Sequence, residues 1–259
     1  MSKVPPRLLS GLGLTLMLII VGSYLLIPQK SSAETATLAV AANFTATAKA
    51  LQDAFEAQSN HTVKLSFGST GKLYTQIING APFDAFLAAD DVRPAQLIAQ
   101  QYADPNSEFT YARGRLALYS RSLNLTDDLA ILLKRTDSIK KLAIANIKTA
   151  PYGTAAQEVL QRLDVYESLQ AKLVQGDNIA QTYQFIFTGN ANLGFVALAQ
   201  VINTDNNHYL VVPADYHSPL NQNAVLLARG RDNAAAKEFL RYLKTDGAKK
   251  IIADYGYDL

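Results

Sequence analysis

Four short segments combine small, hydroxyl or amide residues with the predicted start of a helix: 41–45, 67–71, 150–154 and 176–179. The first backbone N–H groups of a helix have no acceptor within the helix, and the helix dipole places partial positive charge at that end. Anions bind at such helix starts. None of the four segments contains Lys, Arg or His. Neutral donors alone would therefore hold a ligand between them, which suits a fully ionised oxyanion.

The second segment reads Phe-Gly-Ser-Thr-Gly and lies between an apolar, β-branched run and a helical pattern. Ser69 and Thr70 each offer a hydroxyl donor, and Gly68 and Gly71 allow the backbone to approach a ligand closely. The same segment also fits an ordinary helix N-cap in a βα loop. Its function therefore depends on whether the other three segments lie beside it.

The first hundred residues predict three βα units in series, with strands over 37–42, 62–67 and 83–88. Consecutive units of this kind form a parallel sheet with right-handed crossovers. A further strand over 113–120 is interpreted as the passage into a second α/β lobe, and the helices predicted over 233–255 have no place to pack except on the first lobe. We therefore predict an α/β protein of two parallel-sheet lobes, with two crossovers and a ligand cleft between them.

The predicted first lobe comprises residues 34–113 and a return segment, 223–259, and the second lobe comprises residues 114–222. The polar run 221–223 is interpreted as the joint before a strand over 224–228. In sheets of this kind, ligands lie at the carboxyl ends of the strands. The four helix starts are therefore expected to face one another across the cleft.

Residues 1–33 have the composition of an export signal, with Lys3 and Arg7 ahead of an apolar run and small residues before a cleavage site after Ala33. The apolar run over 8–27 is also long enough to be an uncleaved membrane anchor. With either interpretation, the remainder is expected to be exported to the periplasm.

The export signal contains three of the 24 basic residues and no acidic residue, which leaves 21 basic residues against 22 acidic ones. No strongly basic face is indicated, which argues against nucleic acid as a partner. The absence of Cys excludes disulfides, thiolate metal sites and lipid attachment through an N-terminal Cys. We expect a monomer without a cofactor.

Other residues that could do chemistry have simpler interpretations. The adjacent pair Asp90 and Asp91 fits a helix start better than an acid–base pair. Ser69 lacks the Gly-x-Ser-x-Gly spacing of a nucleophile, and no His is close in sequence. Metal-binding spacing is absent among the three histidines, His61, His208 and His217. An exported hydrolase is therefore the weaker alternative, and we predict that the protein is not an enzyme.

Five motifs follow one another in the chain: Ala-Ala-Asn-Phe-Thr (41–45), Phe-Gly-Ser-Thr-Gly-Lys-Leu-Tyr-Thr-Gln-Ile (67–77), Gly-Ala-Pro-Phe-Asp-Ala-Phe-Leu-Ala-Ala-Asp (80–90), Ala-Pro-Tyr-Gly (150–153) and Leu-Gly-Phe-Val (193–196). From about Leu38 to the end, the chain resembles the molybdate-binding proteins of ABC importers. The resemblance implies a type II periplasmic binding fold that closes around molybdate or tungstate without catalysis. It also implies delivery of the oxyanion to a membrane permease.

The resemblance also implies a set of ligand contacts. The first falls on Asn43, the hydroxyl contact on Thr70 with Ser69 as the adjacent alternative, and two backbone N–H contacts on Tyr152 and Ile179. No metal ligand from the protein is expected, because the metal enters only as the oxyanion. Sulfate or phosphate is the alternative ligand. Pocket size separates sulfate from the larger molybdate, and the sequence does not give the pocket volume.

One position departs from the family pattern. Some members place a tyrosine hydroxyl on the oxyanion just after the Leu-Gly-x-Val strand, and this chain has Ala197 there. Tyr152 is the candidate that could supply the missing phenol instead.

Overall fold

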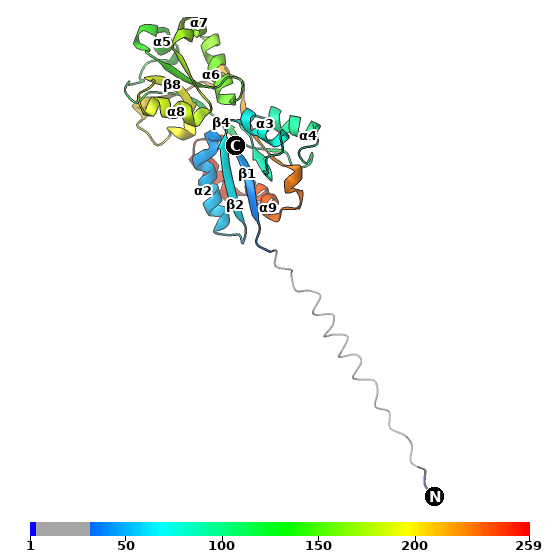
Figure 1. Ribbon diagram of the computed structural model, residues 1–259. Coiled ribbons are helices and arrows are strands. Elements are labelled where there is room, and N and C mark those ends of the chain that lie inside the picture. The colour runs from blue at the N-terminus through cyan, green and yellow to red at the C-terminus, as the bar shows by residue number, and fades with distance from the viewer. Residues whose placement is uncertain (4–31) are drawn as a thin grey trace. The chain divides into compact units, whose positions relative to one another are not determined.

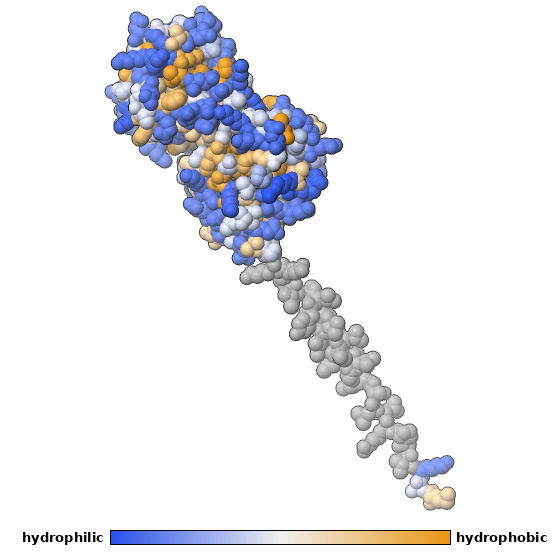
Figure 2. Space-filling view, in the orientation of Figure 1, coloured by the Kyte–Doolittle hydropathy of each residue, from blue (hydrophilic) through white to orange (hydrophobic). Residues whose placement is uncertain are grey.

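A computed structural model describes residues 1–3 and 32–259 of the chain (Figure 1). The predicted export signal lies almost entirely outside the described residues. Within them, no helix has the length and apolar character needed to cross a membrane. Residues 33–259 form one folded unit, and its surface in Figure 2 is mostly hydrophilic with apolar residues scattered over both lobes.

The first sheet contains the three predicted parallel strands and two more. Its order is β2-β1-β3-β10-β4, with bounds Thr62–Gly68, Thr35–Ala41, Ala85–Leu87, Leu220–Leu226 and Phe109–Gly114. β1 pairs in parallel with β2 and β3, whereas β10 is antiparallel to both of its neighbours. β10 reverses the direction because it begins where the chain returns from the second lobe, at the edge where the parallel strands end.

The second sheet has the same character. Its order is β7-β6-β8-β5-β9, with bounds Leu173–Gly176, Leu142–Ala145, Leu193–Ala197, Leu116–Tyr119 and Tyr209–Val211. β6 is parallel to β7 and β8, and β5 is antiparallel to β8 and β9. The two-lobed α/β fold is confirmed, but the sheets are mixed rather than purely parallel, since the strand that enters each lobe starts at the inter-lobe edge.

Helices cover both faces of the first sheet. α2 (Thr45–Glu56), α9 (Ala234–Tyr242) and α10 (Asp246–Asp254) share one apolar core with β1. α3 (Thr70–Ile78) and α4 (Val92–Ala99) pack on the other face. The prediction that the C-terminal helices pack on the first lobe is confirmed; Figure 1 shows α2 and α9 beside β1 and β2.

The second sheet is covered in the same way. α5 (Leu129–Lys134), α6 (Pro151–Arg162) and α7 (Tyr166–Leu169) pack on one face, and α8 (Ile179–Phe187) packs on the other. Short 3-10 helices complete the described chain: η2 Ala42–Phe44, η3 Thr136–Ser138, η4 Gln170–Lys172, η5 Leu198–Gln200, η6 Asn206–His208, η7 Ala214–Tyr216 and η8 Ala228–Asp232.

The strands at the two crossings differ from the predicted ones. The single strand predicted over 113–120 is two strands, β4 and β5, which separate at Arg115 and join different sheets. The polar run 221–223 belongs to β10, where Leu220 already pairs with Gly114 of the first sheet. The division into 34–113, 114–222 and 223–259 stays a proposal, and the strand pairing supports moving its second boundary to before Leu220.

The close approach of chain segments at the first crossing requires a glycine. A Cβ on Gly114 would overlap the hydroxyl oxygen of Tyr152 and lie 2.7 Å from Nε2 of Gln222. Overpacking of this kind lowers stability by about 1–3 kcal/mol. We therefore expect Gly114→Ala to lower the free energy of unfolding by about that amount in urea titrations.

Gly247→Ala is the matched control, because no atom lies within 4 Å of a Cβ placed there in α10. It should raise the free energy of unfolding by about 0.5–1 kcal/mol, since Ala favours a helix over Gly. Equal stabilities for the two variants would show that the crossing tolerates a side chain.

Candidate oxyanion-binding site

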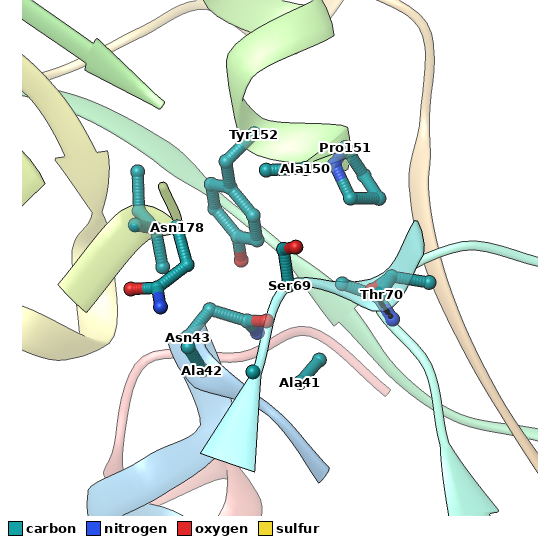
Figure 3. Close-up of a pocket in the computed structure, with 12 residues that line it drawn as sticks. Ala41, Ala42, Asn43, Ser69, Thr70, Ala150, Pro151, Tyr152 and Asn178 are labelled. Carbon is teal, nitrogen blue, oxygen red and sulfur yellow. Dashed lines mark hydrogen bonds between the residues drawn. The ribbon is translucent and has the colours of Figure 1, made fainter. Parts of the chain in front are cut away.

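A small cavity lies where the parallel strands of both sheets end and helices begin. It is lined by Ala41, Ala42, Asn43, Gly68, Ser69, Thr70, Ala89, Ala150, Pro151, Tyr152, Asn178 and Ile179 (Figure 3). The lining contains all four predicted helix starts and all five predicted site residues. Its volume, about 10 Å³ for the centre of a water-sized sphere, is far below the range of pockets for drug-sized ligands. This inter-lobe cavity therefore suits a small ion, and no charged side chain lines it.

On the first lobe, the two hydroxyl groups differ in their hydrogen bonds. Thr70 Oγ1 accepts a hydrogen bond of 3.0 Å from the backbone N–H of Ala89. Ser69 is the N-cap residue of α3, but its side chain makes no cap bond. Its Oγ is buried without a hydrogen-bond partner, which costs about 1–3 kcal/mol. The sequence left Thr70 and Ser69 open. Thr70 accepts from Ala89 and keeps its own proton, so both hydroxyls can donate to a ligand, and Ser69 is the one without any hydrogen-bond partner.

On the second lobe, the helix starts leave backbone N–H groups for the cavity. In α6, Pro151 occupies the first position and has no N–H, so the first N–H of the helix belongs to Tyr152. In α8, the side chain of Asn178 accepts from the backbone N–H groups of Ala180 and Gln181, both at 3.0 Å. This cap uses the second and third N–H groups and leaves the first, that of Ile179.

The Asn43 side chain is directed mainly at the base of the cavity. Its Nδ2 donates to Oε1 of Gln222 at 2.9 Å and to the hydroxyl of Tyr257 at 3.2 Å. The Tyr257 hydroxyl in turn donates to the backbone carbonyl of Asn43 at 2.8 Å. Asn43 therefore offers the cavity its backbone N–H in the first turn of η2, with the amide side chain as an anchor.

The phenol of Tyr152 lies at the same base. Gln222 Nε2 donates to its hydroxyl at 3.3 Å, and in Figure 3 the ring descends from α6 with the hydroxyl directed toward Asn43. Burial raises the pKa of Tyr152 well above its usual value of 10, with smaller contributions from the phenols of Tyr257 and Tyr111. The hydroxyl therefore stays protonated at neutral pH and is able to donate.

Contacts between the lobes close the rim of the cavity. The backbone N–H of Gly71 donates to the carbonyl of Thr149 at 2.8 Å, and Lys72 Nζ lies 2.9 Å from a carboxylate oxygen of Asp177. A Cβ on Gly71 would lie 3.0 Å from Cα of Thr149, so the glycine permits this approach. The two walls are therefore in direct contact beside the cavity.

Sequence reasoning missed Gln222, which was interpreted as part of a polar joint, and Tyr257. Gln222 lies between Asn221 and Asn223, so the local sequence gives no signal that this amide is buried at the site. The residues set aside as alternatives lie elsewhere: Asp90 caps α4 by accepting from the backbone N–H of Arg93. No cluster of three metal-ligating side chains occurs among the described residues.

Two α/β lobes that share a small cavity lined by donors define a solute-binding protein. The family described as "Bacterial extracellular solute-binding protein" matches residues 36–258. The chain belongs to this family, which confirms at family level the resemblance drawn from the five motifs. It is therefore a binding protein rather than an enzyme, and it acts outside the cytoplasm.

The relatives within this family are specific. The chain is 50% identical over 219 residues to the molybdate-binding protein ModA of Rhodobacter capsulatus, covering 85% of this chain and 86% of the relative. It is 46% identical to ModA of Azotobacter vinelandii, with coverage of 95% and 98%. The solved structure of the periplasmic molybdate-binding protein of A. vinelandii superposes with a TM-score of 0.83 at 36% identity, over 86% of this chain and 99% of that chain.

The unpaired hydroxyl of Ser69 leads to a prediction with two separate readouts. Ser69→Ala should leave the ligand-free free energy of unfolding unchanged or raise it by up to about 1 kcal/mol, because a buried unpaired group is removed. Affinity for the bound oxyanion should fall about tenfold, the worth of one hydrogen bond to a charged group. Calorimetric titration and urea unfolding measure the two effects.

Thr75→Ala serves as the control, since its exposed hydroxyl bonds the carbonyl of Gly71 on the same helix without lining the cavity. Its affinity should match that of the parent protein. Full affinity in Ser69→Ala would transfer the hydroxyl role to Thr70.

Proposed function

We propose that this protein binds molybdate, and also tungstate, in the periplasm and delivers the oxyanion to the permease of an ABC transporter. The proposal is carried by the inter-lobe cavity, whose described lining offers neutral donors and no carboxylate. Backbone N–H groups, the Ser69 hydroxyl and the Tyr152 phenol can all donate to an ionised tetrahedral oxyanion. The names of the two ModA relatives support the choice of molybdate.

The proposed contacts are Asn43, Ser69, Thr70, Tyr152 and Ile179. Each hydrogen bond to a charged group is worth about 1.5–3 kcal/mol, and association costs about 4–15 kcal/mol. Five such bonds supply about 8–15 kcal/mol, which is of the same size as the association cost and exceeds its lower part. Export with cleavage after Ala33, action as a monomer and the absence of nucleic-acid binding complete the proposal.

Sulfate and phosphate are the competing ligands. A sulfate-binding protein, SubI of Mycobacterium tuberculosis, has a TM-score of 0.72 to this chain, but at 13% identity the likeness concerns the fold alone. A site without a carboxylate disfavours a partly protonated phosphate, because its O–H group finds no charged acceptor there.

A thermal-shift panel on residues 34–259 tests the ligand. At a free concentration 100 times Kd, ligand binding adds about 2.7 kcal/mol of stability, or a rise in Tm of about 5–11 °C for a chain of this size. We expect this response with molybdate and tungstate, and little or none with sulfate, phosphate or chromate at the same concentration. A comparable sulfate or phosphate response, or no response at all, would contradict the proposal.

The phenol of Tyr152 is the second point of test. We expect Tyr152→Phe to weaken molybdate binding about tenfold in calorimetric titrations, because a donor to the charged ligand is lost. Tyr74→Phe is the control: the Tyr74 hydroxyl pairs with Gln100 outside the inter-lobe cavity, so its affinity should not change. Unchanged affinity in Tyr152→Phe would remove the phenol from the site.

A further inference from the structure

The side chain of Gln222 lies just below the inter-lobe cavity without lining it. It is completely buried, at 0% exposure, in β10 where the chain returns to the first lobe. Its Oε1 accepts from Asn43 Nδ2 at 2.9 Å and from the Tyr111 hydroxyl at 3.1 Å, and that hydroxyl shares its one proton with the Ala88 carbonyl at 3.0 Å. Its Nε2 donates to the Tyr152 hydroxyl at 3.3 Å. One amide thus connects a site residue of each lobe.

The donor and acceptor in each of these hydrogen bonds can be assigned by starting from Tyr257. The Tyr257 hydroxyl donates its single proton to the backbone carbonyl of Asn43, which can only accept. The same hydroxyl must therefore accept from the Asn43 side chain, so that side chain presents its NH2 group. Because this NH2 group also meets Gln222, the Gln222 amide must present its oxygen to Asn43.

The same constraint reaches the cavity. With its oxygen on Asn43, the Gln222 amide can present only its NH2 group to Tyr152. The Tyr152 hydroxyl is then the acceptor in that bond, and its own proton is left for another acceptor. The proton is available to an oxygen of the bound anion.

We infer that Gln222 is a positioning residue, which acts through Tyr152 to make its phenol a donor to the oxyanion. The inference rests on the proposed function, because it needs an acceptor in the cavity. The orientation of the Gln222 amide therefore matters. If its oxygen faced Tyr152 instead, it would accept the phenol proton, and the site would lose a donor.

The test compares two amides on one strand. Gln222→Met keeps the side-chain size and removes both hydrogen-bonding groups. Asn223→Leu does the same at the next position, where the amide pairs with Thr110 and Glu108 instead of with site residues. Both variants should be less stable than the parent, because each loses the hydrogen bonds of a buried amide. Thermal stability alone therefore does not distinguish the two positions.

Affinity for molybdate separates them. Gln222→Met should bind molybdate about tenfold more weakly than the parent, because the phenol loses its fixed direction, and Asn223→Leu should bind within about twofold of the parent. In a Tyr152→Phe background, Gln222→Met should cost clearly less affinity than in the parent, because the phenol is gone and only the contact with Asn43 remains to be lost. Equal losses for both amides, or an undiminished loss without the phenol, would overturn the inference.

Gln222→Glu gives the same test if the Met variant does not fold. The ionised carboxylate accepts from Asn43 as the amide does, but its second oxygen takes the Tyr152 proton, so affinity should fall at least about tenfold at an alkaline pH where the buried carboxyl is ionised. Parental affinity in this variant would also overturn the inference. If the parent protein does not bind molybdate, the proposed ligand is wrong. If the parent binds molybdate and the variant binds it equally well, only the role of Gln222 is wrong.

Discussion

The structure depends on one constraint: buried N–H and O–H groups at the inter-lobe cavity must find an acceptor. Three local features leave such donors unpaired. Pro151 makes the N–H of Tyr152 the first in α6, and the Asn178 cap does not use the first N–H of α8. The Ser69 hydroxyl makes no cap bond. Unpaired buried donors are costly. An anion that brings acceptors removes this cost, so binding and the contact between the two walls favour each other.

The strands that cross between the lobes give this site its base. β4 ends and β10 begins at the same edge, which places Tyr111 and Gln222 beneath the cavity. The mixed direction of the sheets is therefore a consequence of how the cleft is built, because a chain that enters a lobe at the cleft must run against the strands that end there. The strands that connect the lobes therefore also supply the residues at the base of the site.

Because the donors are neutral, the site can hold the anion without a positively charged side chain. Lys72, a cation at the rim, is paired with Asp177 across the lobes, and no Lys or Arg lines the cavity. Hydrogen bonds to a charged ligand weaken together when the walls part, since each depends on distance and direction. A site of this kind can hold an oxyanion firmly when the lobes touch and release it when they separate, which is what delivery to a permease requires.

The sequence by itself determined the βα units and the helix starts that carry unpaired N–H groups, because these follow from local backbone bonding between neighbours in the chain. The resemblance of its motifs to molybdate-binding proteins, rather than local bonding, implied the contacts Asn43, Ser69, Thr70, Tyr152 and Ile179, and the structure brought them to one cavity. Only the tertiary structure decided the mixed strand directions, the hydrogen bond that Thr70 accepts from Ala89, the unpaired hydroxyl of Ser69, and the contacts of Gln222. Asn43 is 179 residues from Gln222 and 214 from Tyr257. No local pattern records such contacts, because they exist only once both crossings have brought the segments together.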